Sequence, residues 1–171
     1  MTTALLRDAF AHNAWATLRV LDACSQLTPE QLATTAPGTY GSILETLQHF
    51  VGSDAYYVSV INGGPIRVIE DEDKEYDLPA LRALAEETQA AWSAVLETDL
   101  DPDRDVIRYR DDGSESHASL GIRLAQALQH GTDHRSQIAT ALTTIGIEPP
   151  EIDVWEFARS EGRLWETEPT A

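Results

Sequence analysis

The chain has 171 residues, of which 42% are hydrophobic and 24% are charged. Its 29 acidic and 12 basic side chains give a formal net charge of −17. This excess of acid argues against nucleic acid and anionic membrane surfaces as partners, because both are bound through clustered Lys and Arg. The length suits one compact domain, and we take residues 1–171 as that single domain.

The sequence also shows none of the marks of a secreted or membrane protein. It contains no apolar run long enough to span a bilayer, and no basic segment followed by an apolar stretch. The only cysteine, Cys24, excludes an intrachain disulfide and the paired-cysteine motifs of redox and zinc-ribbon proteins. We therefore expect a cytoplasmic protein.

The first part of the chain predicts a long helix, a short helix and a loop. Apolar residues recur at three- and four-residue steps from Thr3 to about Leu27, which is typical of an amphipathic helix. Thr28 followed by Pro29 indicates a new helix start. A short helix to about Ala33 should follow, before a loop through residues 37–38.

A second long helix is predicted after this loop. Ser42 and Glu45 match a capping box, in which the two side chains satisfy free backbone amides at a helix start. The helix should run to about Ile61 and stop at residues 62–65, which read Asn-Gly-Gly-Pro. The acidic run over residues 70–77 is most simply a solvated loop.

A third long helix and an irregular connection come next. Asp77 and Pro79 open the helix, and its apolar residues keep helical spacing as far as Leu96. Residues 99–105 form an acidic connector. The segment 106–113 could form a small hairpin or an extended crossover, and the sequence leaves both open.

The fourth long helix is expected from about Ser116 to Thr144, ending at Gly146 and the prolines at 149–150. Asp153 then caps a short helix. Four long helices, with longer connections before the third and the fourth, predict an all-α four-helix bundle with crossover connections and short extra helices.

Two of the five histidines stand out by their spacing. His130 and His134 are four residues apart on the fourth helix, so both imidazoles lie on one face and can reach one divalent metal. The apolar stripe of this helix places them at the flank of the bundle interior, where an unpartnered imidazole costs free energy. Gly131 lies inside the stripe and leaves room for a neighbouring helix or a ligand. The alternative is a plain bundle whose histidines bind nothing.

A tight metal site needs a third ligand, and His49 on the second long helix is the natural candidate. Glu45 lies one turn before it and could orient its ring or accept its proton. Periodicity points the other way, because the apolar stripe of this helix leaves His49 facing solvent beside Glu45 and Tyr56.

Other polar residues in these helices have two interpretations each. Asn13 falls in the apolar stripe of the first helix, where it could reach the metal pocket, although we favour a structural tie to a neighbouring helix. Arg135 could bind a substrate carboxylate, although we favour a salt bridge on the acidic surface.

His12 is expected to be structural or partly exposed, and His117 to lie on the surface. Core or dimer-interface positions are expected for Trp15, Trp92, Trp155 and Phe157.

Several stretches of the chain resemble the DinB/YfiT-like family. Residues 10–17 (FAHNAWAT) and 41–49 (GSILETLQH) look like its first two helices. Residues 128–138 (LQHGTDHRSQI) resemble its third signature, and residues 146–153 (GIEPPEID) resemble its tail. Their order and separation extend the resemblance from residue 10 to about residue 157.

The resemblance implies an up-down-down-up four-helix bundle with a His₃ metal site, and usually a homodimer. By position the ligands would be His49, His130 and His134, and the metal zinc or nickel. This chain departs slightly from the family pattern, because many relatives carry a further histidine just before the arginine and here that neighbour is Asp133. Asp133 replaces none of the three matched histidines.

A site of three neutral imidazoles leaves an open coordination position, which is typical of catalytic metal sites. The metal can then activate water, or bind and deprotonate a small thiol. The family includes thiol-dependent transferases and isomerases that use low-molecular-weight thiols, and also metal-dependent hydrolases. We therefore expect an enzyme of one of these classes acting on a small molecule. The alternative is a non-catalytic metal-binding protein or a metal-stabilised dimer.

Overall fold

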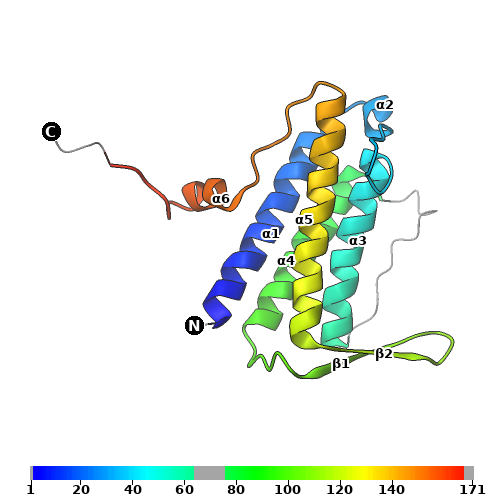
Figure 1. Ribbon diagram of the computed structural model, residues 1–171, viewed down its shortest axis with the longest axis vertical. Coiled ribbons are helices and arrows are strands. Elements are labelled where there is room, and N and C mark those ends of the chain that lie inside the picture. The colour runs from blue at the N-terminus through cyan, green and yellow to red at the C-terminus, as the bar shows by residue number, and fades with distance from the viewer. Residues whose placement is uncertain (1, 64–75, 168–171) are drawn as a thin grey trace.

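The computed structural model describes residues 2–63 and 76–167, and its main body is a bundle of four long helices (Figure 1). The long helices are α1 (Thr2–Cys24), α3 (Ile43–Asn62), α4 (Leu78–Leu96) and α5 (Leu120–Thr144). The short elements are α2 (Pro29–Leu32), α6 (Val154–Ser160), and the strands β1 (Asp105–Tyr109) and β2 (Glu115–Ser119). The chain rises through α1, descends through α3 and α4, and rises again through α5. The predicted all-α bundle with short extra helices is confirmed.

The helices begin where the capping residues predict. At α3, the Ser42 hydroxyl accepts the Glu45 backbone N–H, and the Glu45 carboxylate accepts the Ser42 backbone N–H at 2.7 Å. Asp77 caps α4, and Asp153 caps α6, each by accepting a backbone N–H three residues further on. These bonds satisfy amides that a helix start otherwise leaves without partners.

A two-stranded hairpin occupies the connection between α4 and α5. Strand β1 pairs with β2 in antiparallel register, with Ile107 opposite His117. Of the two possibilities left open by the sequence, the hairpin is therefore the one observed. The fourth helix begins at Leu120 and not at Ser116, so the prediction of its start is wrong, and residues 116–119 belong to β2 instead. Ser116 pairs with Arg108 of β1, which holds its backbone extended, and no pattern within residues 116–119 predicts this pairing.

The core of the bundle consists of two apolar clusters separated by a polar layer. The upper cluster is centred on Val20, Leu21, Cys24, Ile43, Leu47, Phe50, Leu81, Ile138 and Leu142. The lower cluster is centred on Phe10, Val58, Ile61, Trp92, Val95, Leu120, Leu124 and Ala127. Buried polar side chains lie between them along the helices, namely Asn13, Thr17, Thr88, His134 and Arg135. The candidate site is built at this level of the bundle.

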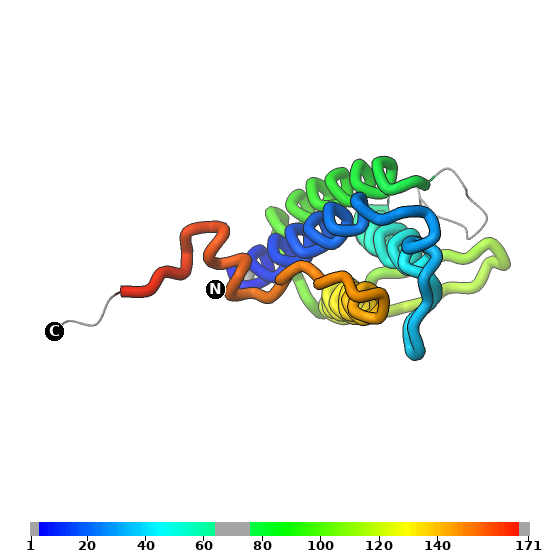
Figure 2. The backbone as a smooth tube through the Cα atoms, turned by 90° about the horizontal axis from the view of Figure 1, so that it is seen from above, coloured from blue at the N-terminus to red at the C-terminus, as the bar shows by residue number. Residues whose placement is uncertain are grey.

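Two smaller expectations concern single residues of the core and the C-terminal segment. Cys24 is fully buried, and burial raises the pKa of its thiol to about 12, so it is an inert core residue. His12 is partly buried, with its Nε2 atom 2.8 Å from the Ile152 carbonyl oxygen, which fits the structural role expected for it. Phe157 of α6 packs beside it, whereas Trp155 is exposed and is not a core residue. Beyond α6 the chain leads away from the bundle (Figure 2).

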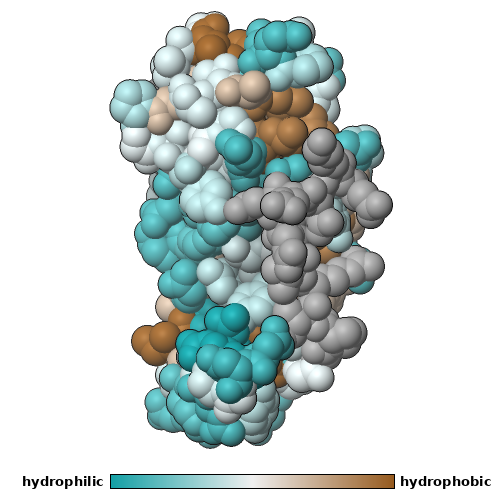
Figure 3. Space-filling model, turned by 90° about the vertical axis from the view of Figure 1, so that its right-hand side faces the viewer, coloured by the Kyte–Doolittle hydropathy of each residue, from teal (hydrophilic) through white to brown (hydrophobic). Residues whose placement is uncertain are grey.

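The face of the molecule beside α3 is mostly hydrophilic, with apolar side chains confined to separate patches (Figure 3). None of the described helices is both long and apolar enough to cross a membrane. The solvated loop predicted over residues 70–77 lies, except for its last two residues, outside the part of the chain that the structure describes.

Candidate metal centre

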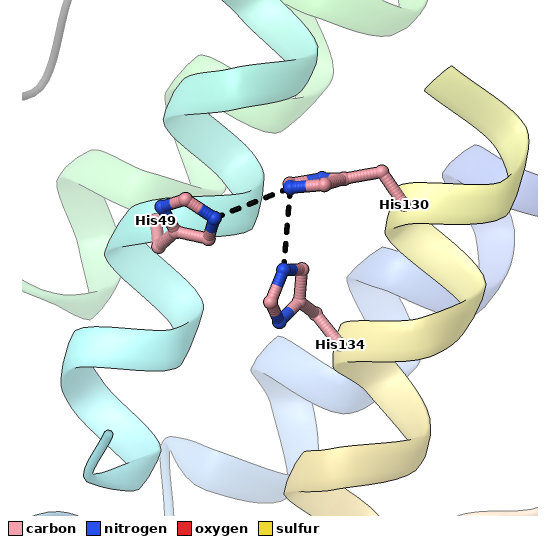
Figure 4. A group of neighbouring side chains, drawn as sticks. All are labelled: His49, His130 and His134. Carbon is pink, nitrogen blue, oxygen red and sulfur yellow. Dashed lines mark hydrogen bonds between the residues drawn. The ribbon is translucent and has the colours of Figure 1, made fainter. Parts of the chain in front are cut away.

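Three histidines from two helices converge at the level of the polar layer (Figure 4). His49 comes from α3, and His130 and His134 come from successive turns of α5. The Nε2 atom of His130 lies 3.2 Å from Nε2 of His49 and 3.2 Å from Nε2 of His134. One nitrogen from each ring lies within 4.8 Å of the others.

This spacing fits a single divalent ion. In a tetrahedral site with metal–nitrogen bonds of about 2.0–2.1 Å, the ligand nitrogens are about 3.3 Å apart. The two Nε2 separations that involve His130, 3.2 Å each, match that value closely. The three histidines could therefore hold a metal ion.

The surroundings favour the neutral form of His130. The pKa of His130 is lowered to about 4, mainly by burial and also by the neighbouring His134 and His49, against a smaller opposing effect of Asp133. Neutral imidazole is the form that binds metal, because the coordinating lone pair must be free. His134 is buried, whereas His49 and His130 are partly exposed, so the cluster is accessible from one side.

Gln137 fixes the ring of His134. Nδ1 of His134 lies 3.1 Å from Oε1 of Gln137, and this oxygen also accepts the backbone N–H of Tyr40 at 2.9 Å. Because Gln137 presents an acceptor, Nδ1 must carry the proton, which leaves the lone pair on Nε2 for a metal. Sequence reasoning did not single out Gln137, although its position three residues after His134 puts it on the same helix face.

Two tyrosines that the sequence did not assign to the site flank the histidines. The Tyr40 ring stacks on His49 with ring centroids 3.9 Å apart, and its edge meets His134 at 5.7 Å. The Tyr57 ring stands edge-on to His130 at 5.5 Å. Aromatic contacts of this kind restrict ring rotation, so the imidazoles are held in place from both sides.

The structure gives His49 and Glu45 different roles from those that periodicity suggested. His49 is not turned to solvent but points across to α5, where it meets His130. The Glu45 carboxylate closes the capping box at Ser42, and these hydrogen bonds lower its pKa. Capping of α3, and not orientation of His49, is the role that these bonds assign to it.

Arg135 and Asn13 belong to the polar layer behind the histidines. The Arg135 side chain is 3% exposed, so the expected salt bridge on the acidic surface is wrong. Its Nη1 group donates to Oδ1 of Asn13 at 2.7 Å and to Oγ1 of Thr17 at 3.1 Å. Asn13 therefore ties α1 to α5, as the favoured structural interpretation predicted.

Gly131 and Asp54 complete this layer. A Cβ atom at Gly131 would lie 2.8 Å from both Arg135 Nη1 and Asn13 Oδ1, so the room that the sequence indicated is taken by this pair. Asp54 accepts the Trp92 indole N–H at 2.9 Å. Burial raises the pKa of Asp54 to about 6, although the Trp92 hydrogen bond and the positive charge of Arg135 both act to lower it.

Comparison with known families agrees with the geometry. The model of the DinB family matches residues 1–169, which is almost the whole chain. None of the curated proteins compared with the chain matches it significantly. The family match covers all four long helices and the three converging histidines. The chain therefore belongs to the DinB family.

Proposed function

We propose that this protein is a metal-dependent enzyme that acts on a small molecule, with His49, His130 and His134 as ligands of a zinc or nickel ion. The observation that carries the proposal is the convergence of three imidazoles, in which Nε2 of His130 lies 3.2 Å from Nε2 of each of the other two rings. Within the described residues the cluster contains three ligand side chains, which leaves a coordination position for a substrate or co-substrate.

A bound divalent ion would supply Lewis acidity, lowering the pKa of a thiol or a water molecule at the open position. The protein contributes neutral ligands, so the ion would keep its full positive charge. Gln137 holds the His134 ring in the tautomer that presents Nε2, and Tyr40 shields one side of His49. Two reaction classes suit this arrangement: transfer or isomerisation with a low-molecular-weight thiol, and hydrolysis with water.

Metal content is the first test. Untagged protein should contain about one equivalent of zinc or nickel per chain, measured by elemental analysis after gel filtration. Each of the variants His49→Ala, His130→Ala and His134→Ala should lose most of that metal. His117→Ala is the matched control, because His117 lies on the exposed hairpin. Unchanged metal content in all three site variants would overturn the ligand assignment.

The open position is the second test, and it separates an enzyme from a non-catalytic metal-binding bundle. Co²⁺-loaded protein should change its visible absorption when a small thiol such as 2-mercaptoethanol is added, because thiolate is a good ligand for such ions. A spectrum that does not respond to thiol, azide or a change of pH would indicate a closed site and favour the structural role.

We also propose that the protein forms a homodimer. Large apolar side chains are exposed on α6 and just beyond it, namely Val154, Trp155 and Trp165. Exposed apolar side chains gathered on one segment are typical of interaction surfaces. Light scattering should give twice the 18.8 kDa mass of the chain. Trp155→Ser should shift the protein towards monomer, whereas Tyr109→Ser, at an exposed position on the hairpin, should not.

A further inference from the structure

A groove lies between α3, α5 and the hairpin. It has a volume of about 150 Å³ and is lined by Tyr57 of α3, Ala118 of β2, and Ile122, Arg123 and Gln126 of α5. Its lining residue Tyr57 connects it to the metal centre, because the Tyr57 ring contacts the His130 ring with centroids 5.5 Å apart. Gln126 lies one helical turn before His130, on the same face of α5.

The groove carries a positive charge in a strongly negative protein. Nε and Nη2 of Arg123 are held by the carbonyl oxygens of Val106 and Ser116, which fixes the guanidinium in place. Its Nη1 group makes no hydrogen bond to the described residues. Among the residues that the structure describes, none of those lining the groove is a carboxylate, although the chain as a whole carries a net charge of −17. The groove therefore suits an anionic group.

The rest of the lining combines an apolar wall with one oriented hydroxyl. Ile122 is 64% exposed and, with Ala118, forms the apolar part. Gln126 donates its side-chain N–H to the Tyr57 hydroxyl oxygen at 3.3 Å. Since that oxygen already accepts, the Tyr57 hydroxyl proton is left to donate to a ligand. The groove therefore offers hydrogen-bond donors and one cation beside an apolar wall. These groups suit a ligand with an apolar body and a terminal hydrogen-bond acceptor.

The length of the ligand follows from the helix. Arg123 and His130 are seven residues apart on α5. At about 1.5 Å per residue, this places them about 10 Å apart along the helix axis. A ligand with its reactive atom at the histidines would therefore reach Arg123 with a group about 10 Å away.

We propose that this groove binds the tail of the substrate, and that the substrate is a small molecule with a metal-binding head, a mainly apolar body and a terminal carboxylate. The inference rests on the proposed function, because the head must bind at His49, His130 and His134. It adds a substrate class, anionic and elongated, and assigns Arg123 as the residue that selects it.

The probe is 8-mercaptooctanoate, whose extended chain is of the required length, compared with the neutral 8-mercaptooctan-1-ol. Each is titrated into Co²⁺-loaded protein, and its affinity is read from the thiolate-dependent change in the visible spectrum. The carboxylate should bind about fivefold more tightly than the alcohol, as expected for a partly exposed charge pair with hydrogen bonds. The short mercaptoacetate should not share this advantage, because it cannot reach Arg123.

Two variants test the groove independently of each other. Arg123→Gln should abolish the preference for the carboxylate. Because Arg123 also ties the hairpin to α5, Ile122→Glu provides a second test at an exposed position: its added negative charge should weaken 8-mercaptooctanoate about fivefold and leave the alcohol unchanged. The matched controls are Arg159→Gln on α6 and Leu5→Glu at an exposed position on α1, neither of which lines the groove, and both should behave as the natural protein does.

The possible failures can be told apart. Protein that binds Co²⁺ and thiols but does not distinguish the acid from the alcohol would overturn the groove assignment and leave the proposed function standing. A preference that survives in both Arg123→Gln and Ile122→Glu would also overturn it. Protein that binds no Co²⁺ at its histidines would remove the proposed function itself, and the groove assignment with it.

Discussion

His134 and Gln137 form the hydrogen bond that decides which nitrogen of the ring faces the other two histidines. Nδ1 of His134 donates to Oε1 of Gln137 over 3.1 Å, and the same oxygen accepts the Tyr40 backbone N–H at 2.9 Å. One amide therefore connects the metal centre to the loop before α3. This loop also supplies the aromatic ring that stacks on His49.

Removing this acceptor should weaken metal binding without removing a ligand. Gln137→Ala leaves the His134 ring free to rotate and to change tautomer, and we expect metal affinity to fall about 10- to 100-fold. Gln137→Glu keeps an acceptor at Nδ1 and should retain most of the affinity. Competition with a chromophoric chelator measures both, and Ser136→Ala, an exposed neighbour, is the control. Equal affinity in Gln137→Ala and the natural protein would show that the bond does not position the ring.

Asn13 should matter for stability more than for metal binding. Asn13→Leu removes the oxygen that lies 2.7 Å from Arg135 Nη1, and leaves a buried charge without its shortest hydrogen bond. We expect a loss of about 3 kcal/mol in the free energy of unfolding, measured by urea denaturation. Asn13→Asp, which keeps the oxygen, should lose much less.

A double variant tests whether the loss comes from the pair. Asn13→Leu combined with Arg135→Met should be less destabilised than the sum of the single variants, because the second substitution removes the stranded charge. Additive effects would contradict the pairing. Loss of metal from Asn13→Leu without loss of stability would instead favour the role at the metal pocket.

Gly131→Ala tests the tight contact behind His134. An alanine in a helix interior is ordinarily about 1 kcal/mol more favourable than glycine. Here the added Cβ would lie 2.8 Å from the atoms of Asn13 and Arg135 that bond to each other. Because both side chains are buried, we expect a net loss of about 1–3 kcal/mol in thermal or urea unfolding. A stabilised variant would show that the two side chains move aside freely.

Asp54 should make the free energy of unfolding depend on pH in the direction opposite to that of a carboxyl group whose pKa is lowered by folding. Its pKa is raised by burial from the ordinary 3.8 to about 6 in the folded state. Between these values the folded protein keeps a proton that the unfolded chain has released. The contribution of Asp54 to the free energy of unfolding should therefore fall as the pH rises through this window.

The comparison with Asp54→Asn isolates this contribution from the other carboxyl groups. The amide does not titrate but can still accept the Trp92 N–H. Urea denaturation of both proteins from pH 4 to pH 7 should show the natural protein losing stability relative to the variant as the pH increases. Asp103→Asn, at an exposed position, should show no such trend. A constant difference between the two proteins across this range would contradict the raised pKa.

Local signals predicted the helices well and the hairpin poorly. The capping residues Ser42 and Asp77 mark helix starts that the structure confirms, because a cap is a contact between residues three apart in the sequence. The sequence predicts that the fourth helix starts at about Ser116, yet residues 116–119 form most of β2. Their partner strand lies about a dozen residues earlier, and no periodicity within the segment itself indicates that pairing.

The candidate site likewise contains residues that local spacing predicts and residues that it does not. The spacing of His130 and His134 is enough to place both on one face of a helix, whatever the rest of the chain does. The periodicity of α3 left His49 facing solvent, and the family resemblance, not the helical pattern, assigned it to the site. Arg135 looked like a surface cation, but it is buried because Asn13 and Thr17 supply oxygen partners from another helix.

The sequence by itself determined the helices, their order and the pair of imidazoles on α5, because these depend on contacts within a few residues of each other. It also determined the net charge of −17, which argues against phosphate-rich partners. Only the tertiary structure decided that His49 meets that pair, and that Gln137 and Tyr40 hold its members. It likewise decided that Arg123 lines a groove together with Tyr57, whose ring contacts His130. These relationships join different helices and loops, and packing brings them together only when the apolar clusters above and below the polar layer are buried.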